Sequence, residues 1–257
     1  SRAVRKPSRY EHVIATYRDN TYPPDTVGKD TPVTTVFKGN EDVKSEEVLA
    51  FELGYRIRPV PDFSLDVAAF YNVYDNLMSP KNLNVFDRVF YTLSTWTYDN
   101  IMKGSTYGLE VAANWDIYPW WRLRASYSYL EMDLTVEDQG ELVFDSNVAE
   151  RSPHHQVSLR SMIDLPWNIE LDTWLRYVDS LSYVQRRDYG ENFPYTDLPG
   201  YLELDARLGW KVNSNLELSL VGRNLLQTKH PEFFEYDYSK LGAEVERSVY
   251  FKVTWRF

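Results

Sequence analysis

Hydrophobic and polar side chains alternate strictly over the last part of the chain, residues 247–257. Every second residue there is apolar: Val249, Phe251, Val253, Trp255 and Phe257. The residues between them are mostly polar. Because successive side chains of a strand point to opposite faces, this pattern predicts a strand with one apolar and one polar face. A sheet that crosses a membrane must be closed by a last strand, so the pattern predicts a terminal barrel strand.

The same alternation recurs along most of the chain. It predicts nine strands after residue 45, and residues 1–5 look like the tail of a tenth. The nine strands cover residues 46–58, 63–73, 89–115, 121–129, 155–164, 169–177, 202–211, 216–220 and 247–257. Residues 6–44 are irregular, polar and interrupted by prolines, and residues 75–88 are polar. Both stretches are therefore predicted to be connections without strands.

The connections alternate between short and long. Short ones fall near residues 60, 117, 166 and 213, and long ones near 25, 80, 140, 190 and 236. Outer-membrane barrels have short periplasmic turns and long extracellular loops, and their tilted strands need about 9–11 residues to cross the bilayer. The prediction is an all-β, antiparallel transmembrane β-barrel with its C-terminus in the periplasm. Counting residues 89–115 as one strand keeps every short turn on the periplasmic side.

The polar positions of the predicted strands carry many charges. These are Glu52, Arg56, Arg58, Asp66, Glu110, Arg122, Arg124, Arg160, Glu170, Asp172, Arg176, Glu203, Asp205, Arg207, Lys211 and Glu217. Lipid would not tolerate them, whereas a lumen filled by water or by a plug would. An open soluble sheet is the alternative, but it would leave exposed edges and an apolar face that needs a covering layer.

Composition narrows the class of protein further. The 257 residues include 20 Tyr, 12 Phe and 8 Trp, which suits aromatic girdles at two membrane interfaces; an aromatic-rich soluble sandwich is the alternative. No apolar run approaches the ~20 residues of a membrane helix. The net charge of −10 argues against a nucleic-acid partner, which would require a basic surface. With four His and no Cys, neither a disulfide nor a closed zinc site is expected.

Five short stretches, in order along the chain, carry a further signal. They are Ser-Arg-Ala-Val-Arg-Lys-Pro-Ser-Arg at 1–9, Gly-Asn-Glu-Asp-Val-Lys-Ser-Glu-Glu at 39–47, Thr-Tyr-Gly-Leu-Glu at 106–110, Val-Gly-Arg-Asn-Leu-Leu at 221–226 and Val-Thr-Trp-Arg-Phe at 253–257. Together they resemble motifs of the TonB-dependent outer-membrane receptors, although the second stretch lacks both prolines of the family pattern. The resemblance implies a barrel of about 22 strands, of which residues 1–257 form the C-terminal part, the last ten or so strands. The family's plug domain and TonB box are absent from these residues.

The resemblance also implies a location and partners. The location is the outer membrane of a Gram-negative bacterium, with lipid and lipopolysaccharide around the barrel. The TonB complex would act through the missing N-terminal region. The barrel-assembly machinery would recognise the C-terminal strand through Phe251, Val253, Trp255 and Phe257.

Two predicted long loops combine aromatic and basic side chains. The candidate binding residues are Arg186, Arg187, Tyr189 and Tyr195 in one loop, and His230, Phe234 and Tyr236 in the other. Such side chains suit an anionic, aromatic metal chelate. The resemblance therefore implies TonB-dependent uptake of a ferric siderophore, with no cofactor bound by the chain itself. Haem and cobalamin remain alternative ligands. For haem, His12 lies in the loop where haem receptors of the family have a histidine. The alternative for both loops is packing on one another or on lipopolysaccharide.

Two other classes of outer-membrane barrel compete with a receptor. One is an enzyme, either a protease or a phospholipase, for which Asp145, Glu150 and His154 would be the residues to consider. Carboxylates in an acidic loop are more often simply solvated, so we expect no catalytic residues. The other class is a passive porin or adhesin. A plug domain and a TonB box upstream of residue 1 would separate a receptor from both.

Overall fold

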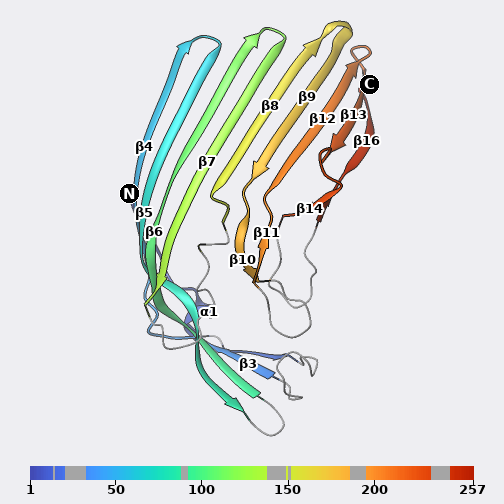
Figure 1. The fold of residues 1–257 in the computed structure, drawn as a ribbon. Helices are drawn as coiled ribbons and strands as arrows, with labels where there is room; N and C mark the ends of the chain where they lie inside the picture. Colours follow the sequence, from blue (N-terminus) through green and yellow to red (C-terminus); the bar gives the residue numbers. More distant parts are fainter. Residues whose placement is uncertain are drawn as a thin grey trace.

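Ten strands, each antiparallel to its neighbours, form the main path of a twelve-stranded sheet. The structure is a computed structural model that describes residues 1–13, 15–20, 33–87, 92–137, 149, 152–185, 195–232 and 244–257. In sheet order the strands are β1 (Arg2–Arg5), β4 (Glu46–Val60), β5 (Phe63–Asp87), β6 (Thr92–Tyr118), β7 (Trp121–Val136), β8 (His155–Leu165), β9 (Ile169–Val178), β12 (Tyr201–Lys211), β13 (Leu216–Arg223) and β16 (Ser248–Trp255). Figure 1 shows them as a tilted, curved wall, and β1 and β16 are its two edges. The strand number and order predicted from the alternation are confirmed.

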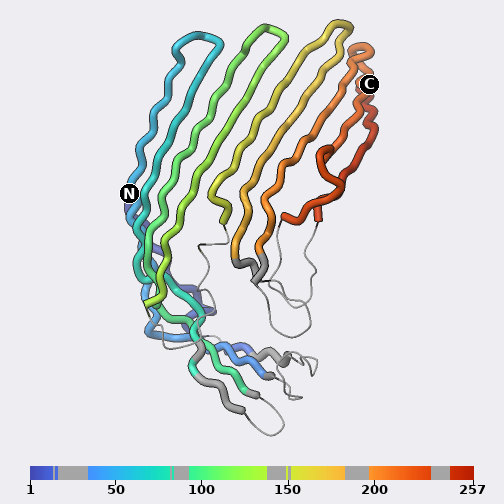
Figure 2. Tube along the Cα trace, viewed as in Figure 1, coloured from blue at the N-terminus to red at the C-terminus, as the bar shows by residue number. Residues whose placement is uncertain are grey.

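Short turns join the strands at one end of the wall. They lie at residues 61–62, 119–120, 166–168 and 213–215, along the upper end in Figure 1. In the last of them, Asn213 Oδ1 accepts hydrogen bonds from the backbone N–H groups of Asn215 and Leu216, each 2.9 Å long. An asparagine in this position closes a turn without help from the neighbouring strands. The other connections leave from the opposite end (Figure 2), as predicted, although the predicted long connection near residue 80 is mostly strand.

One face of the wall is apolar and exposed. Leu53 is 76% accessible and Phe251 is 61% accessible. Their cross-strand neighbours are also apolar, Ala69 for Leu53 and Leu220 for Phe251. A continuous apolar surface of this kind is unfavourable in water and favourable against hydrocarbon. This is therefore the lipid face.

Aromatic side chains lie at two levels along the lipid face. Near the short turns, the ring of Trp120 stacks on Tyr118 with centroids 5.3 Å apart. Further along the strands, Tyr127 Oη is 2.9 Å from His155 Nδ1, and the rings of Tyr129 and His155 are 5.2 Å apart. Rings with one polar tip are favoured where hydrocarbon meets water. The two levels therefore correspond to the expected girdles, and His155 belongs to one of them.

The prediction that residues 75–88 form a polar connection is wrong. β5 continues to Asp87 and β6 begins at Thr92, so these strands extend into a long hairpin. The strand register shifts after Tyr74, close to Asn76, whose φ is 56°. Beyond this point the hairpin bends away from the wall (Figure 1). The strands continue there although the sequence lacks the period-two hydrophobic alternation of the wall.

The prediction that residues 6–44 are irregular is also wrong in part. They contain α1 (Arg9–Val13), β2 (Thr16–Asn20) and β3 (Val33–Lys38). β2 pairs antiparallel with β3, and β3 lies parallel to the extended part of β6. No helix in the described part of the chain is both long enough and apolar enough to cross a membrane.

The face assignment is testable with one substitution at two adjacent residues. Ala69 lies about halfway along the membrane-crossing part of β5, between Leu53 and Leu109, whereas Ala68 lies between Gly54 and Glu110. We expect Ala69→Arg to destabilise the folded barrel by about 2–4 kcal/mol, because it places a charge in hydrocarbon. Ala68→Arg should cost much less, because its guanidinium faces Glu110. The measurement is urea unfolding of the full-length protein in lipid vesicles, and equal costs would contradict the assignment.

Candidate ligand-binding surface

Ion pairs connect neighbouring strands on the polar face of the wall. Arg207 on β12 donates hydrogen bonds to Glu170 and Asp172 on β9, at 3.0 and 3.1 Å, and to Glu217 on β13 at 2.6 Å. One guanidinium thus joins three neighbouring strands. Arg is suited to this task because its planar group carries five donors in fixed directions. The charges that the sequence assigned to the inner face are therefore neutralised largely by one another.

A second arginine forms a similar group nearer the loop end. Arg176 on β9 bonds Glu203 and Asp205 on β12, at 2.6 and 3.0 Å. Its guanidinium carbon lies 4.0 Å from the ring centroid of Trp174. Trp174 Nε1 in turn donates a hydrogen bond of 2.7 Å to Ser158 Oγ. The arginine is therefore fixed by both charge and stacking.

Small side chains leave a hollow on the same face. Its volume is about 450 Å³. Its lining includes Asp66, Ala68, Glu110, Ala112, Ser126, Ser128, Gln156, Ser158 and Arg176. These residues come from β5 to β9 and occupy the polar positions of the alternation. The inner face thus has open space along β5 to β9, which suits a further layer of protein or water against it.

The loops that carry the candidate binding residues start from one end of the wall. β10 (Leu181–Gln185) pairs with β11 (Tyr195–Leu198), and β14 (Lys229–Pro231) pairs with β15 (Glu244–Glu246). Both hairpins lie at the end opposite the short turns (Figure 1). Tyr195 begins β11, where it pairs with Gln185, and His230 lies in β14, where it pairs with Val245. The other candidates, Arg186, Arg187, Tyr189, Phe234 and Tyr236, lie outside the described residues.

Asn224 ties the β14–β15 hairpin to the wall. This residue is fully buried and has a φ of 49°, a conformation that asparagine tolerates better than most residues. Its backbone N–H donates to Asp205 Oδ1 at 3.0 Å, and its side-chain Nδ2 donates to the carbonyl of Val245 at 2.9 Å. The next residue, Leu225, bonds the carbonyl of Leu204 at 2.9 Å. The Asn-Leu-Leu stretch thus turns the chain back over β12.

A further ion pair closes the hairpin itself. Lys229 Nζ donates a hydrogen bond of 2.6 Å to Glu244. This bond to a carboxylate raises the pKa of Lys229 above its usual value. Both groups are exposed, so the pair orients the hairpin more than it stabilises the protein.

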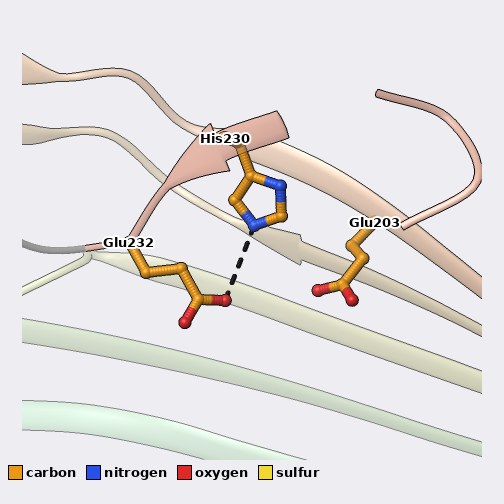
Figure 3. A group of neighbouring side chains, drawn as sticks. All are labelled: Glu203, His230 and Glu232. Carbon is orange, nitrogen blue, oxygen red and sulfur yellow. Dashed lines mark ion pairs between the residues drawn. The ribbon is translucent and has the colours of Figure 1, made fainter. Parts of the chain in front are cut away.

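Three titratable side chains converge where β14 meets β12 (Figure 3). His230 and Glu203 are 3% and 4% accessible, and Glu232 is exposed. One ligand atom from each lies within 4.8 Å of the other two. Glu203 and Glu232 were not among the predicted site residues. The alternation assigns Glu203 only to the inner face, and no sequence signal brings residues 203 and 230 together.

The fold and its two faces define a class of protein. A tilted antiparallel wall with a lipid face, a charged inner face and longer loops at one end is an outer-membrane β-barrel. Residues 4–225 match the family described as TonB dependent receptor-like, beta-barrel, and the chain belongs to this family. The resemblance read from the five motifs is confirmed.

Known proteins similar to this chain include siderophore receptors. The probable TonB-dependent siderophore receptor PiuA of Acinetobacter baumannii is 22% identical over 240 residues, which cover 87% of this chain and 28% of PiuA. The catecholate siderophore receptor Fiu of Escherichia coli is 27% identical over 136 residues, covering 52% of this chain and 17% of Fiu. The solved siderophore receptor PirA of Acinetobacter baumannii has a TM-score of 0.67 at 14% identity, over 100% of this chain and 38% of PirA, which shows a shared fold. The chain thus spans well under half the length of these proteins.

Membership of this family decides against the enzyme alternative. The family consists of receptors and transporters, not of enzymes. Of the residues considered for a protease, His154 is exposed, with its Nε2 3.9 Å from Glu131 Oε1. Asp145 and Glu150 lie outside the described residues. The prediction of a non-enzymatic barrel is confirmed by the family.

Asn224 provides a test of how the hairpin is held. We expect Asn224→Ala to destabilise the hairpin locally by about 1–3 kcal/mol, because the Val245 carbonyl loses its donor and the left-handed φ becomes unfavourable. Asn224→Gly should cost less, because glycine adopts this φ freely. The measurement is amide hydrogen exchange over residues 244–246 in the full-length protein in detergent. Asn215→Ala, at the opposite end of the wall, is the control, and unchanged exchange in both Asn224 variants would show that this side chain does not hold the hairpin.

Proposed function

We propose that this chain forms the C-terminal part of the barrel of an outer-membrane receptor that takes up a ferric siderophore in a TonB-dependent manner. The observation that carries the proposal is its membership of the TonB-dependent receptor family together with its similarity to siderophore receptors. Fiu is described as a catecholate receptor, which makes a catecholate chelate the first cargo to test. Haem and cobalamin are the alternative cargoes to test after it.

The chemistry of the loops supports an anionic, aromatic cargo. A ferric catecholate complex presents negative oxygens and aromatic rings. Arg186 and Arg187 offer charge-assisted hydrogen bonds to such oxygens, and Tyr189 and Tyr195 offer rings for stacking. In the second loop, Phe234 and Tyr236 offer the same aromatic surface.

Partners and orientation belong to the same proposal. The TonB complex would act through an N-terminal region, and a plug domain would lie against the inner face, where the hollow leaves room for it. Lipid and lipopolysaccharide would surround the apolar face. The barrel-assembly machinery would recognise the terminal strand through Phe251, Val253, Trp255 and Phe257. Short turns on the periplasmic side would put the C-terminus in the periplasm of a Gram-negative bacterium.

A passive porin is the remaining alternative, and energy dependence separates it from a receptor. We expect accumulation of a radiolabelled ferric catecholate by cells that produce the full-length protein. The accumulation should be lost when TonB is deleted, while binding at the cell surface remains. Uptake that persists without TonB would contradict the proposal.

The loop arginines give a sharper test. We expect Arg186→Ala/Arg187→Ala to weaken chelate binding by about tenfold or more, since hydrogen bonds to charged groups contribute about 1.5–3 kcal/mol each. Binding should weaken and not vanish, because the aromatic side chains remain. The measurement is labelled-chelate binding to whole cells, with receptor level checked in the outer membrane. The matched control is Arg56→Ala/Arg58→Ala at the short-turn end of β4. Equal chelate affinity in both double variants would show that the loop does not bind the chelate and serves in packing instead.

A further inference from the structure

His230 is buried without a hydrogen bond. It is 3% accessible, and neither ring nitrogen has a hydrogen-bond partner among the described residues. Its ring stacks on Tyr201 with centroids 4.2 Å apart and planes 20° apart, so the plane of the imidazole is fixed. Buried polar groups are nearly always satisfied, and an exception indicates a missing partner such as an ion.

Two carboxylates face the same space as this imidazole. Nε2 of His230 lies 3.5 Å from Glu232 Oε1, too far for a good hydrogen bond. Glu203 approaches from β12, and one ligand atom of each residue lies within 4.8 Å of the other two. In Figure 3 a dashed line joins the imidazole to Glu232, and the Glu203 carboxylate lies on the same side of the ring. We propose that Glu203, His230 and Glu232 bind one divalent transition-metal cation of the Zn²⁺ type.

The donor set suits zinc better than magnesium or calcium. One imidazole nitrogen with two carboxylate oxygens is a borderline set that Zn²⁺ accepts, with water as a fourth ligand. Mg²⁺ and Ca²⁺ prefer sites made of oxygen alone. Zinc bonds of about 2.0–2.2 Å place tetrahedral donors roughly 3.4 Å apart. The present spacing therefore needs a contraction, which the exposed Glu232 can supply by rotating its side chain.

The local charge also favours a dication. Among the described residues, Glu203, Asp205 and Glu232 contribute three negative charges, and Arg176 contributes a positive charge that contacts two of them. With a neutral imidazole the group has a net charge of −2. Arg176 occupies Oε1 of Glu203, which leaves Oε2 for a metal. The nearby Lys229 is paired with Glu244 and does not compete.

The cation would link the β14–β15 hairpin to the wall. Glu203 belongs to β12, whereas His230 and Glu232 belong to β14 and the residue after it. A metal would therefore join two segments that Asn224 already brings together. Composition argues against a closed zinc site, whereas the site proposed here has three protein ligands and an open fourth position. It requires the barrel fold but not siderophore uptake, so failure of the proposed function would leave it standing.

Zinc binding to the full-length protein tests the site. The protein is purified in detergent, stripped with a chelator and titrated with Zn²⁺ alone in a calorimeter. We expect one site that is lost or weakened at least about tenfold in Glu232→Gln and in His230→Gln, since loss even of an outer-shell partner has an effect of this size. His154→Ala is the matched control, because His154 also faces a glutamate but is exposed, and it should bind zinc as the wild type does. Co²⁺ in place of Zn²⁺ should give the intense visible absorption of a four-coordinate site.

Four results would contradict the proposed zinc site. The proposal is overturned if wild type lacks the site, if Glu232→Gln and His230→Gln bind zinc as tightly as wild type, or if His154→Ala removes the binding. A pale cobalt spectrum like that of the hydrated ion would overturn it as well. Should His230→Gln fail to fold, Glu232→Gln decides alone, because Glu232 is exposed and its isosteric change leaves the wall intact.

Discussion

The fold depends on one constraint, which is that every backbone N–H and C=O in hydrocarbon must be paired. Isolated strands cannot meet this requirement, whereas a continuous sheet meets it through hydrogen bonds between neighbours. Ten strands paired in order along the chain satisfy it between neighbours, from β1 at one edge of the wall to β16 at the other. The same constraint explains the short turns: a tight turn such as that at Asn213 saturates its own amides and returns the chain into the sheet at once.

Pairing the backbone then determines where side chains lie. Because strand faces alternate with period two, a wall in lipid must send every second side chain inward. Charges on the inner side are tolerated only if water or opposite charges surround them. Arg207 shows how this is achieved, since one guanidinium on β12 contacts carboxylates on β9 and β13. The inner face is thus a network across strands and not a row of independent charges.

This division of labour explains what the sequence could predict. Strands in lipid were predicted correctly because hydrocarbon imposes a strict alternation, which is visible at Leu53 or Phe251 without any structure. The β5–β6 extension and the short elements between residues 6 and 44 were missed because the sequence there lacks this alternation. For the candidate site, His230 was selected for its loop, but its partners Glu203 and Glu232 were not. Their convergence depends on how Asn224 turns the chain over β12, which is a tertiary contact that no local pattern encodes.

The start of β12 shows how the wall and the loops are coupled. Leu204 points its side chain to the lipid face while its carbonyl accepts the N–H of Leu225. Its neighbours Glu203 and Asp205 point inward, where Asp205 bonds both Arg176 and Asn224. A slip of one residue in this strand would exchange the two faces and break all of these contacts together. The position of the β14–β15 hairpin is therefore set by the register of the wall. The backbone pairing that lipid requires thus also determines where this loop lies, at the end opposite the short turns.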